Sequence, residues 1–581
     1  MMRCETVVLA CVAALFFAPA ASAKCEIEML AVLPVTMHGR SPTTDGEING
    51  RPVHFIIDSG AFYSTLSPAI ARELKLPTTP LPPQFHMRGI GGEANAGLTK
   101  VREVKLADIP INNIIFLVGG SDTGSAGLIG QNILGIHDVE YDLEHGAVRL
   151  MRGHDCATAS LAYWAAGKPS TVLPIEPFDQ RDPHTIGTIL VNGVKMRAGF
   201  DTGAASSVIT PQAARRAGVT PESAGVVRDG YARGLGSKQV PSWRAPFDSI
   251  DMGGEKLKHV TLGMHELGGS VDMLIGIDFF LAHRVFVSNA THQMFFTYDG
   301  GPLFGRKPAR VVSAEGQVVA LSENGNEPTD AAGFSARGAA SASKGDFAGA
   351  LGDLNRAVAL APDDGRYLYQ RAQVRLALRQ SALAFDDLSK AIPLAPSDAE
   401  IRLVHGRLAI AKGDRPLAAV DARAADRILA PQAAARLALA GLFGELDDYE
   451  AALGSYESWL HFHAEDGLRS TALSGRCRAL AALNRDLDKA LSDCNTALKL
   501  RPNTAGFLNN RGLVHLRRGE NDAAVSDYDA ALALAPNLAM ARYARGIAET
   551  RLGQSDAAER DRAAADAIDP RIAARVDALH L

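Results

Sequence analysis

The chain has 581 residues, which is too long for a single hydrophobic core and predicts several domains. Hydrophobic residues make up 47% of the sequence and charged residues 22%, a composition typical of ordinary globular protein. The formal net charge of -5 leaves no basic excess that could hold a phosphate backbone. We therefore expect no nucleic-acid partner.

The first 23 residues have the order of a secretory signal peptide. Arg3 is followed by an apolar run over residues 7–17 and then by the small residues 21–23. A membrane anchor is the alternative, but a spanning helix needs about 20 apolar residues and this run is shorter. We therefore predict that residues 1–23 are removed, that the mature chain has no stable membrane span, and that it is exported, as a periplasmic or secreted protein.

Four cysteines follow that segment, an even number in a compartment that allows disulfides. Cys25 and Cys156 bracket the first part of the chain, whereas Cys477 and Cys494 lie close together much later. They are candidates for two disulfides, with buried free thiols as the alternative. The sequence contains neither a CxxC nor an HExxH spacing, so it predicts no metal site.

Comparison of the chain with itself finds two copies of one unit. An Asn-Gly pair precedes Asp-Ser-Gly-Ala at residues 58–61, and a second Asn-Gly pair precedes Asp-Thr-Gly-Ala at residues 201–204. Three more matching pairs of segments follow in the same order: residues 67–68 and 210–211, 88–92 and 233–237, and 128–130 and 274–276. Four matches in one order indicate a duplication that covers about residues 45–150 and 185–297.

Each copy has the pattern of a mostly β unit. The apolar runs are short and β-branched, as at residues 53–57 and 114–118, and Gly, Pro and Asn separate them. The two Asn-Gly pairs suit tight hairpins, whose central residues need positive φ. We place the first unit at residues 24–160 and the second at residues 161–300.

A repeat of a different kind begins near residue 331, where Ala, Leu and charged residues recur with helical periodicity. Prolines recur in two series with a spacing of 34 residues, Pro362 and Pro396, then Pro502, Pro536 and Pro570. Small residues occupy the eighth and twentieth positions of these units, among them Gly338, Ala372, Gly512, Gly546, Ala350, Ala384, Ala490, Ala524 and Ala558. The pattern resembles the tetratricopeptide repeat (TPR), whose helix pairs cross at small residues. We predict about seven repeats over residues 331–572, with protein or peptide partners.

The segment between these regions, residues 301–330, is rich in Gly and Pro. It has no sustained periodicity, which indicates a linker. A final strand of the β region near residues 311–321 is the alternative.

The stretches at residues 55–61 and 198–204 resemble the active-site turns of aspartic peptidases, and most closely those of the retropepsin-like branch. In that family an apolar-apolar-Gly segment packs behind each catalytic loop, a role that fits Leu-Ile-Gly at residues 128–130 and 274–276. The resemblance covers about residues 45–297. It departs from the viral enzymes in one respect, since they pair two separate chains and this chain carries both units. The implied fold is a duplicated all-β acid protease domain followed by an all-α TPR solenoid.

The resemblance implies an aspartic-type endopeptidase, with Asp58 and Asp201 as the catalytic pair. Two carboxylates about 3 Å apart cannot both ionise cheaply, so one holds a proton while the other accepts one from the attacking water. This is general acid–base hydrolysis of a peptide or protein substrate, without a metal, a cofactor or a covalent intermediate. By resemblance, the residues that support the two turns are Ser59, Gly60, Thr202 and Gly203.

Two Arg-Gly-Ile/Leu-Gly segments begin 30 and 32 residues after the two aspartates, where retropepsin-like chains carry a flap hairpin. Glycines there allow a flap to bend over a bound peptide and exclude water. A plain surface turn is the alternative. The candidate flap residues are Gly89, Ile90, Gly91, Gly234, Leu235 and Gly236.

A third Asp-Thr-Gly, at residues 122–124, follows Gly-Gly-Ser instead of an apolar strand and has no partner in the second copy. We therefore predict no catalytic role for Asp122. The sequence favours a peptidase that acts outside the cytoplasm, with repeats that bind protein partners. The alternative is a catalytically inactive protease-like domain in a TPR interaction scaffold, and the two intact Asp-Ser/Thr-Gly turns favour the enzyme.

Overall fold

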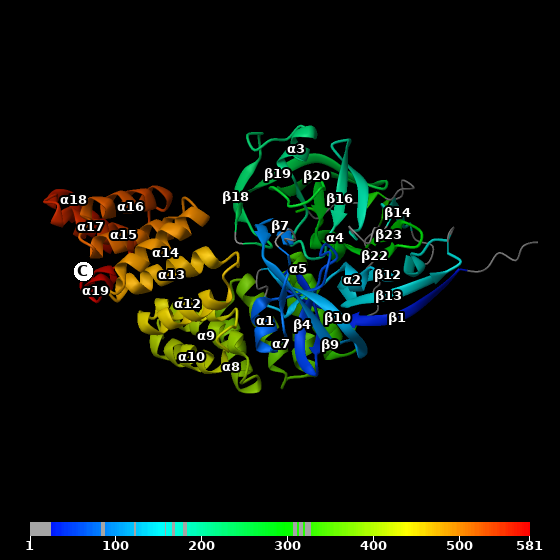
Figure 1. The fold of residues 1–581 in the computed structure, drawn as a ribbon, viewed down its shortest axis with the longest axis horizontal. Helices are drawn as coiled ribbons and strands as arrows, with labels where there is room; N and C mark the ends of the chain where they lie inside the picture. The colour runs from blue at the N-terminus through cyan, green and yellow to red at the C-terminus, as the bar shows by residue number, and fades with distance from the viewer. Residues whose placement is uncertain are drawn as a thin grey trace, which may run out of the picture.

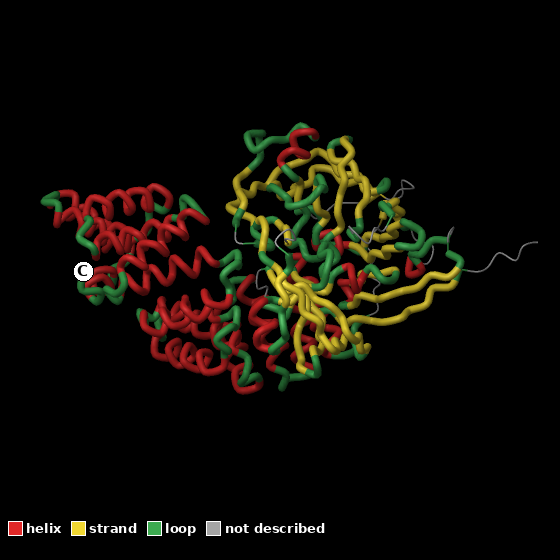
Figure 2. Tube along the Cα trace, viewed as in Figure 1, coloured by secondary structure: helices red, strands yellow, loops and turns green. Residues whose placement is uncertain are grey.

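The computed structural model describes several stretches of the chain. They cover residues 25–82, 87–120, 124–156, 159–165, 169–177, 183–236, 238–305, 311–312, 318–319 and 327–581. Strands dominate the part up to Val319, and helices form the part from Ala331 onward (Figure 1, Figure 2). The predicted fold class, an all-β region followed by an all-α solenoid, is confirmed. The predicted signal peptide, residues 1–23, lies outside the described residues.

The first unit is an eight-stranded sheet that curls into a barrel. Its order is β2-β3-β4-β11-β5-β10-β9-β6, and the barrel closes where β3 also pairs with β9. The strands are β2 (Thr36–His38), β3 (Ser41–Ile48), β4 (Arg51–Ile57), β5 (Thr65–Leu66), β6 (Thr79–Pro80), β9 (Ala96–Leu106), β10 (Ile109–Gly119) and β11 (Gly127–Ile129). Helix α1 (Pro68–Glu73) begins after Ser67, whose side chain accepts the Ile70 amide as an N-cap.

The second unit repeats this closed order strand for strand. In it, β15-β16-β21-β17-β20-β19 corresponds to β3-β4-β11-β5-β10-β9, and β19 pairs with both β15 and β20. Its strands are β15 (Ile186–Val191), β16 (Val194–Phe200), β17 (Val208–Ile209), β18 (Val227–Ala232), β19 (Val240–Met252), β20 (Glu255–Met264) and β21 (Met273–Ile275). Helix α3 (Pro211–Arg216) has a Thr210 N-cap and is the counterpart of α1. The internal duplication read from the sequence is therefore also a duplication of topology.

Part of the predicted linker, residues 301–330, extends the second barrel. β24 (Val311–Val312) pairs with β20, and β25 (Val318–Val319) pairs with β24. A final strand near residues 311–321 is the alternative to a linker in the sequence analysis, and the structure has two short strands there. Residues 306–310, 313–317 and 320–326 of this segment lie outside the described residues.

A six-stranded sheet joins the two units. Its order is β1-β13-β12-β22-β23-β14, and the antiparallel pair β12–β22 joins a strand of one unit to a strand of the other. The strands are β1 (Glu26–Pro34), β12 (Asp138–Asp142), β13 (Ala147–His154), β14 (Thr171–Pro174), β22 (His283–Ser288) and β23 (Gln293–Tyr298). Short helices flank them, namely α2 (Gln131–Leu134), η1 (Leu143–His145), η2 (Tyr163–Ala165) and α4 (Ile277–Ala282).

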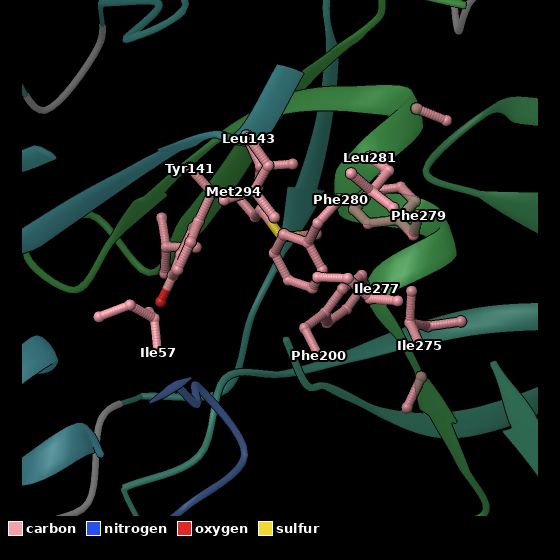
Figure 3. Packing of buried hydrophobic residues seen from close by; sticks show 14 of the residues in the cluster. Ile57, Tyr141, Leu143, Phe200, Ile275, Ile277, Phe279, Phe280, Leu281 and Met294 are labelled. Carbon is pink, nitrogen blue, oxygen red and sulfur yellow. The ribbon is translucent and has the colours of Figure 1, made fainter. Parts of the chain in front are cut away.

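One hydrophobic core runs through both units and the sheet that joins them. Figure 3 shows a part of it in which Tyr141 lies near Ile57 and the Phe200 side chain lies near the residues of α4. Ile57 and Phe200 immediately precede the two aspartates and are 0% and 2% exposed. Phe200 packs edge-on against Phe279, with ring centroids 5.6 Å apart. Because both residues are buried in one core, the two aspartate turns are held against each other.

The described residues from 327 onward form seven antiparallel helix pairs and a final short helix. The first helices of the pairs are α5 (Ala331–Lys344), α7 (Gly365–Ala377), α9 (Ala399–Ala411), α11 (Arg436–Glu445), α13 (Arg469–Ala482), α15 (Ala505–Arg517) and α17 (Ala539–Arg551). The second helices are α6 (Phe347–Leu360), α8 (Ser381–Leu394), α10 (Arg415–Ile428), α12 (Tyr449–Phe462), α14 (Leu487–Leu500), α16 (Asn521–Leu534) and α18 (Ser555–Ile568), and α19 (Ile572–Asp577) follows. No helix in the part of the chain that the structure describes is long and apolar enough to cross a membrane.

Two kinds of recurring contact hold the helix pairs together. The first is small-residue packing: a Cβ added to Gly512 would lie 2.8 Å from the Tyr528 ring. The second is an ion pair that joins the two helices in five of the seven pairs, such as Arg511 with Asp527, in which two guanidinium nitrogens donate to the two carboxylate oxygens at 2.8 and 2.6 Å. The equivalent pairs are Arg337–Asp353, Arg371–Asp387, Arg476–Asp493 and Arg545–Asp561. Since both partners are largely buried and doubly bonded, each pair fixes the position of the second helix on the first.

The solenoid contacts the β region at several points along its length. Lys344 of α5 forms a 2.9 Å ion pair with Glu144 of η1. Further along, the Gln432 side-chain amide donates to the Glu73 carboxylate at 3.0 Å, and the Arg72 guanidinium lies over the Phe462 ring at 5.4 Å. The repeats therefore pack along the first unit, as the course of α5 to α12 in Figure 1 shows.

The four cysteines after residue 24 form two disulfides, Cys25–Cys156 and Cys477–Cys494. We predict that neither pair reacts with an alkylating reagent in denaturant until a reductant is added. Cys477 and Cys494 join the two helices α13 and α14 across 17 residues, a loop for which reduction costs about 3 kcal/mol of stability. Mass spectrometry of the alkylated peptides measures how far each cysteine is labelled, and equal labelling before and after reduction would count against the bridges.

Candidate active site

Two equivalent strands, one in each unit, position the candidate aspartates. β4 ends at Ile57 and β16 ends at Phe200, so Asp58 and Asp201 each begin a turn. The Leu-Ile-Gly segments lie directly beside these strands, because β11 pairs in parallel with β4 and β21 with β16. The amide of Asp58 donates to the Ile129 carbonyl at 3.0 Å, and that of Asp201 donates to the Ile275 carbonyl at 2.9 Å. Each turn is thus anchored from behind by its own unit.

Reciprocal hydrogen bonds lock the two turns to each other. The Thr202 hydroxyl oxygen accepts the Ser59 amide at 3.0 Å and donates to the Ile57 carbonyl at 2.8 Å. The Ser59 hydroxyl oxygen accepts the Thr202 amide at 2.9 Å and donates to the Phe200 carbonyl at 3.0 Å. Ser59 is 2% exposed and Thr202 is 0% exposed. Both hydroxyls are therefore fully engaged in holding the turns, which leaves neither of them available as a nucleophile.

The two carboxyl groups meet in the space that the turn glycines leave open. A Cβ built on Gly60 would lie 2.2 Å from Asp201 Cγ, and one built on Gly203 would lie 2.4 Å from Asp58 Cγ. The Asp58 and Asp201 side chains hydrogen-bond to each other, and both stay partly accessible. The structure thus brings together the six predicted residues of the two turns, Asp58, Ser59, Gly60, Asp201, Thr202 and Gly203.

The two carboxyl groups are buried together and electrostatically coupled. Burial and then the charge of Asp201 raise the pKa of Asp58 well above its ordinary value, and the amides of Gly60 and Ala61 oppose that increase. Burial also raises the pKa of Asp201, and the amides of Gly203 and Ala204 oppose the increase there. The Gly60 amide donates to Asp58 Oδ1 at 3.0 Å, and the Gly203 amide donates to Asp201 Oδ1 at 2.8 Å. The two carboxyl groups therefore titrate as one pair that shares a proton.

Both candidate flap segments are hairpin tips, and they meet each other. β7 (Met87–Gly89) pairs with β8 (Gly92–Ala94) around Ile90 and Gly91, while β18 and β19 pair on either side of residues 233–239. The Lys238 amide donates to the Gly91 carbonyl at 3.0 Å, and a Cβ on Gly89 would lie 2.6 Å from Leu235 Cβ. The glycines are therefore required for the close approach of the two tips.

The second hairpin also contacts the solenoid. The side-chain amide of Gln239 donates to the Gly467 carbonyl, in the loop between α12 and α13, at 3.0 Å. The Tyr231 hydroxyl donates to the Pro502 carbonyl at 3.4 Å. One hairpin thus touches both the opposite unit and the repeats. Asp122, which the sequence excludes from the site, lies outside the described residues.

The sequence does not predict three residues that the structure places near the aspartate turns. The Gln131 side-chain amide donates to the Ser59 carbonyl at 2.8 Å, and the buried Tyr141 hydroxyl contacts the Ser59 side chain. Burial raises the pKa of Tyr141, and the hydrogen bond to Ser59 partly offsets this. His184 Nε2 lies 3.1 Å from the Gly60 carbonyl oxygen. None of the three belongs to a pattern shared by the two copies, since the second copy has Ile277 where the first has Gln131.

Several solved structures are similar to the chain. They include the APC/C hetero-tetramer Cut9-Hcn1 (18% identity, 38% of this chain and 43% of that chain, TM-score 0.32) and a tetratricopeptide repeat protein from Parabacteroides merdae (18% identity, 38% and 86%, TM-score 0.29). A third is YrrB, described as a TPR protein with an unusual peptide-binding site (18% identity, 39% and 98%, TM-score 0.21). This chain spans less than half the length of the Cut9-Hcn1 chain that it matches. No curated protein matches the chain.

Family models match both halves of the duplication and the repeats. Residues 44–135 match the model described as gag-polyprotein putative aspartyl protease, and residues 187–279 match the model described as aspartyl protease. Residues 505–538 match a tetratricopeptide repeat. Each aspartyl protease match contains one of the two aspartate turns and the apolar segment behind it. The chain therefore carries two aspartyl protease-like domains followed by a tetratricopeptide-repeat solenoid.

Proposed function

We propose that the chain is an aspartic-type endopeptidase and that Asp58 and Asp201 activate the attacking water. The observation that carries this proposal is the meeting of two largely buried carboxyl groups from matched turns, each held by amides of its own unit. The aspartyl protease matches to both units support it. In this proposal the repeats bind protein or peptide partners.

The coupled pair supplies both a base and an acid in the proposed reaction. The ionised carboxylate of the pair removes a proton from water as the water oxygen attacks the scissile carbonyl carbon, and the protonated carboxyl group gives its proton to the carbonyl oxygen. The tetrahedral intermediate then collapses. The carboxyl group that took the water proton gives it to the amide nitrogen, which leaves as the amine, while a hydroxyl of the intermediate returns its proton to the other carboxylate and the new carboxylic acid is released. The reciprocal bonds of Ser59 and Thr202 hold the two carboxyl groups in register throughout. No metal, cofactor or covalent intermediate takes part.

We also propose that the protein works outside the cytoplasm. The order of residues 1–23 supports export, and two disulfides support an oxidising compartment, the periplasm or the exterior. The competing function is an inactive protease-like domain in an interaction scaffold. Two complete Asp-Ser/Thr-Gly turns favour the enzyme over that alternative.

The pH dependence of cleavage tests the proposed function. Activity requires one proton on the pair, so we predict a bell-shaped rate profile. Because burial raises the pKa of both aspartates, we expect the basic limb, where the pair loses its last proton, to lie above the ordinary carboxyl pKa. Initial rates on an unfolded protein substrate, with and without a statine-type inhibitor of aspartic peptidases, provide the measurement. A rate that rises steadily to alkaline pH and resists the inhibitor would contradict the proposal.

A further inference from the structure

The solenoid changes the length of its loops in the region where it contacts the β region. Four of the loops between successive helix pairs have four residues each, namely 361–364, 395–398, 501–504 and 535–538. The other two, 429–435 and 463–468, have seven and six residues. Both longer loops contact the β region, through Gln432 and Gly467. Their additional residues therefore serve the contact with the β region, because the stacking of helix pairs elsewhere in the solenoid needs only four.

Buried side chains hold the loop 463–468 in one conformation. The His463 ring stacks on the Trp459 ring, with centroids 4.5 Å apart, and its Nδ1 donates to the Trp459 carbonyl at 2.8 Å. Asp466 is 3% exposed and accepts a backbone amide of the loop at 2.6 Å. The loop is thus a rigid support for whatever it contacts.

This loop links the first unit to the second hairpin, which consists of β18 and β19. Just before the loop, the Phe462 ring packs against a guanidinium of α1 in the first unit. At the other end of the loop, the Gly467 carbonyl accepts the Gln239 side-chain amide, and the Tyr231 hydroxyl donates to the nearby Pro502 carbonyl. Figure 1 shows the loop before α13 at the end of β18. Because the solenoid rests on the first unit, these contacts tie a hairpin of the second unit to the first.

The two hairpin tips are closed on each other and on the aspartate turns. The Lys238 amide donates to the Gly91 carbonyl at 3.0 Å. A Cβ built on Gly120, which follows β10 of the first unit, would lie 2.5 Å from Leu235 Cδ1 of the second tip. β10 pairs with β5, the strand that follows the Asp58 turn, so the second tip closes beside the aspartates. A peptide chain that enters the site has to part the two tips.

We propose that the loop 463–468 is a latch that holds the second hairpin closed, so that the solenoid controls the entry of substrate. Opening the hairpin breaks the bonds from Gln239 and Tyr231, while the solenoid stays on the first unit. A partner protein that shifts α12 and α13 would release the hairpin and raise the open fraction. The control of substrate entry rests on the proposed peptidase function, whereas the latch itself is measured without any cleavage.

Hydrogen exchange at the Lys238 amide tests the latch, because opening the hairpin breaks the bond of this amide to the Gly91 carbonyl. In the full chain, the double variant Gln239→Ala/Tyr231→Phe removes both side-chain bonds to the solenoid. We expect exchange at Lys238 to become about 2- to 10-fold faster, the effect of losing one to two ordinary hydrogen bonds. Thermal melting should show that the variant is folded. If the double variant does not fold, Gln239→Ala alone carries the test.

Gln432→Ala is the matched control. It also removes a side-chain amide that joins the solenoid to the β region, but its partner is Glu73 of the first unit and not the hairpin. Exchange at the Lys238 amide should therefore equal that of the parent. The control separates release of the latch from a general weakening of the contact between solenoid and β region.

Steady-state kinetics on an unfolded protein substrate test the control of entry. If substrate binds only to the open form, the apparent KM is raised in proportion as the open fraction falls. The double variant should therefore lower KM by about 2- to 10-fold and leave kcat unchanged. A merely structural effect of the substitutions would lower kcat instead.

Three results would overturn the proposal. The first is unchanged exchange at Lys238 in a folded Gln239→Ala variant, and the second is equal acceleration by Gln432→Ala. The third is faster exchange with an unchanged KM, because the hairpin would then not limit entry. Faster exchange in a chain that cleaves no substrate would support the latch and contradict the proposed peptidase function.

Discussion

Replacing Asp58 or Asp201 with asparagine is expected to lower the rate of peptide cleavage by at least about 10²–10⁴-fold, the contribution of a positioned acid–base group. An amide can neither hold the proton that the pair supplies to the substrate nor accept the one that the pair removes from water. The substitution is nearly isosteric, so the reciprocal Ser59–Thr202 bonds should survive it. Initial rates of the purified variants on one peptide substrate measure the effect.

Stability measurements separate this chemical loss from unfolding. The pKa of Asp58 is raised in the folded chain, so the unfolded chain loses its proton first as pH rises, and this ionisation weakens folding above the ordinary carboxyl pKa. An asparagine side chain cannot ionise, and the Asp58→Asn variant should therefore melt at or above the temperature of the parent at neutral pH. Asp122→Asn is the matched control and should retain nearly full activity. An inactive Asp122→Asn variant together with an active Asp201→Asn variant would refute the assignment of Asp58 and Asp201 as the catalytic pair.

Gly60→Ala is expected to have the second largest effect. The added Cβ would lie 2.2 Å from Asp201 Cγ and 2.4 Å from both of its carboxylate oxygens, and the turn has no room to move away because Ser59 is locked to Thr202. The two turns must separate, which should cost about 1–3 kcal/mol of stability and remove the contact between the two carboxyl groups. Activity should fall to the level of the asparagine variants. Thermal melting and initial rates together provide the measurement.

Gly269→Ala is the control for this prediction. Gly269 lies in the second unit of the β region, and a Cβ built on it meets nothing within 4 Å. The variant should match the parent in both melting temperature and rate. If Gly60→Ala cleaved as fast as Gly269→Ala, the close approach of the two turns would be wrong.

The sequence predicts the local parts of the site because they repeat. Asp58 and Asp201 follow apolar strands in both copies, and the Leu-Ile-Gly segments recur at nearly the same distance. The repeat makes the two turns and the two hairpin tips recognisable without an alignment. The same holds for the solenoid, whose small residues recur with a fixed period.

The other parts of the fold and of the site depend on contacts between distant segments, and no sequence pattern indicates which segments make these contacts. The sheet that joins the units pairs Tyr141 with Val285, and nothing in either strand specifies the other. Gln131 and Tyr141 support Ser59 from the first copy only, so a search for repeated residues passes over them. The Arg511–Asp527 pair and its equivalents are likewise charged residues that a sequence places at the surface, and only the stacking of the helices buries them.

The most direct test of the central claim is mass spectrometry of a peptide library incubated with the purified chain and, in parallel, with the Asp58→Asn/Asp201→Asn double variant. The account predicts new peptide termini in the parent sample at acidic to neutral pH, their loss in the presence of a statine-type inhibitor, and none in the variant sample. A folded parent that cleaves no bond at any pH, or a double variant that produces the same termini as the parent, would contradict it.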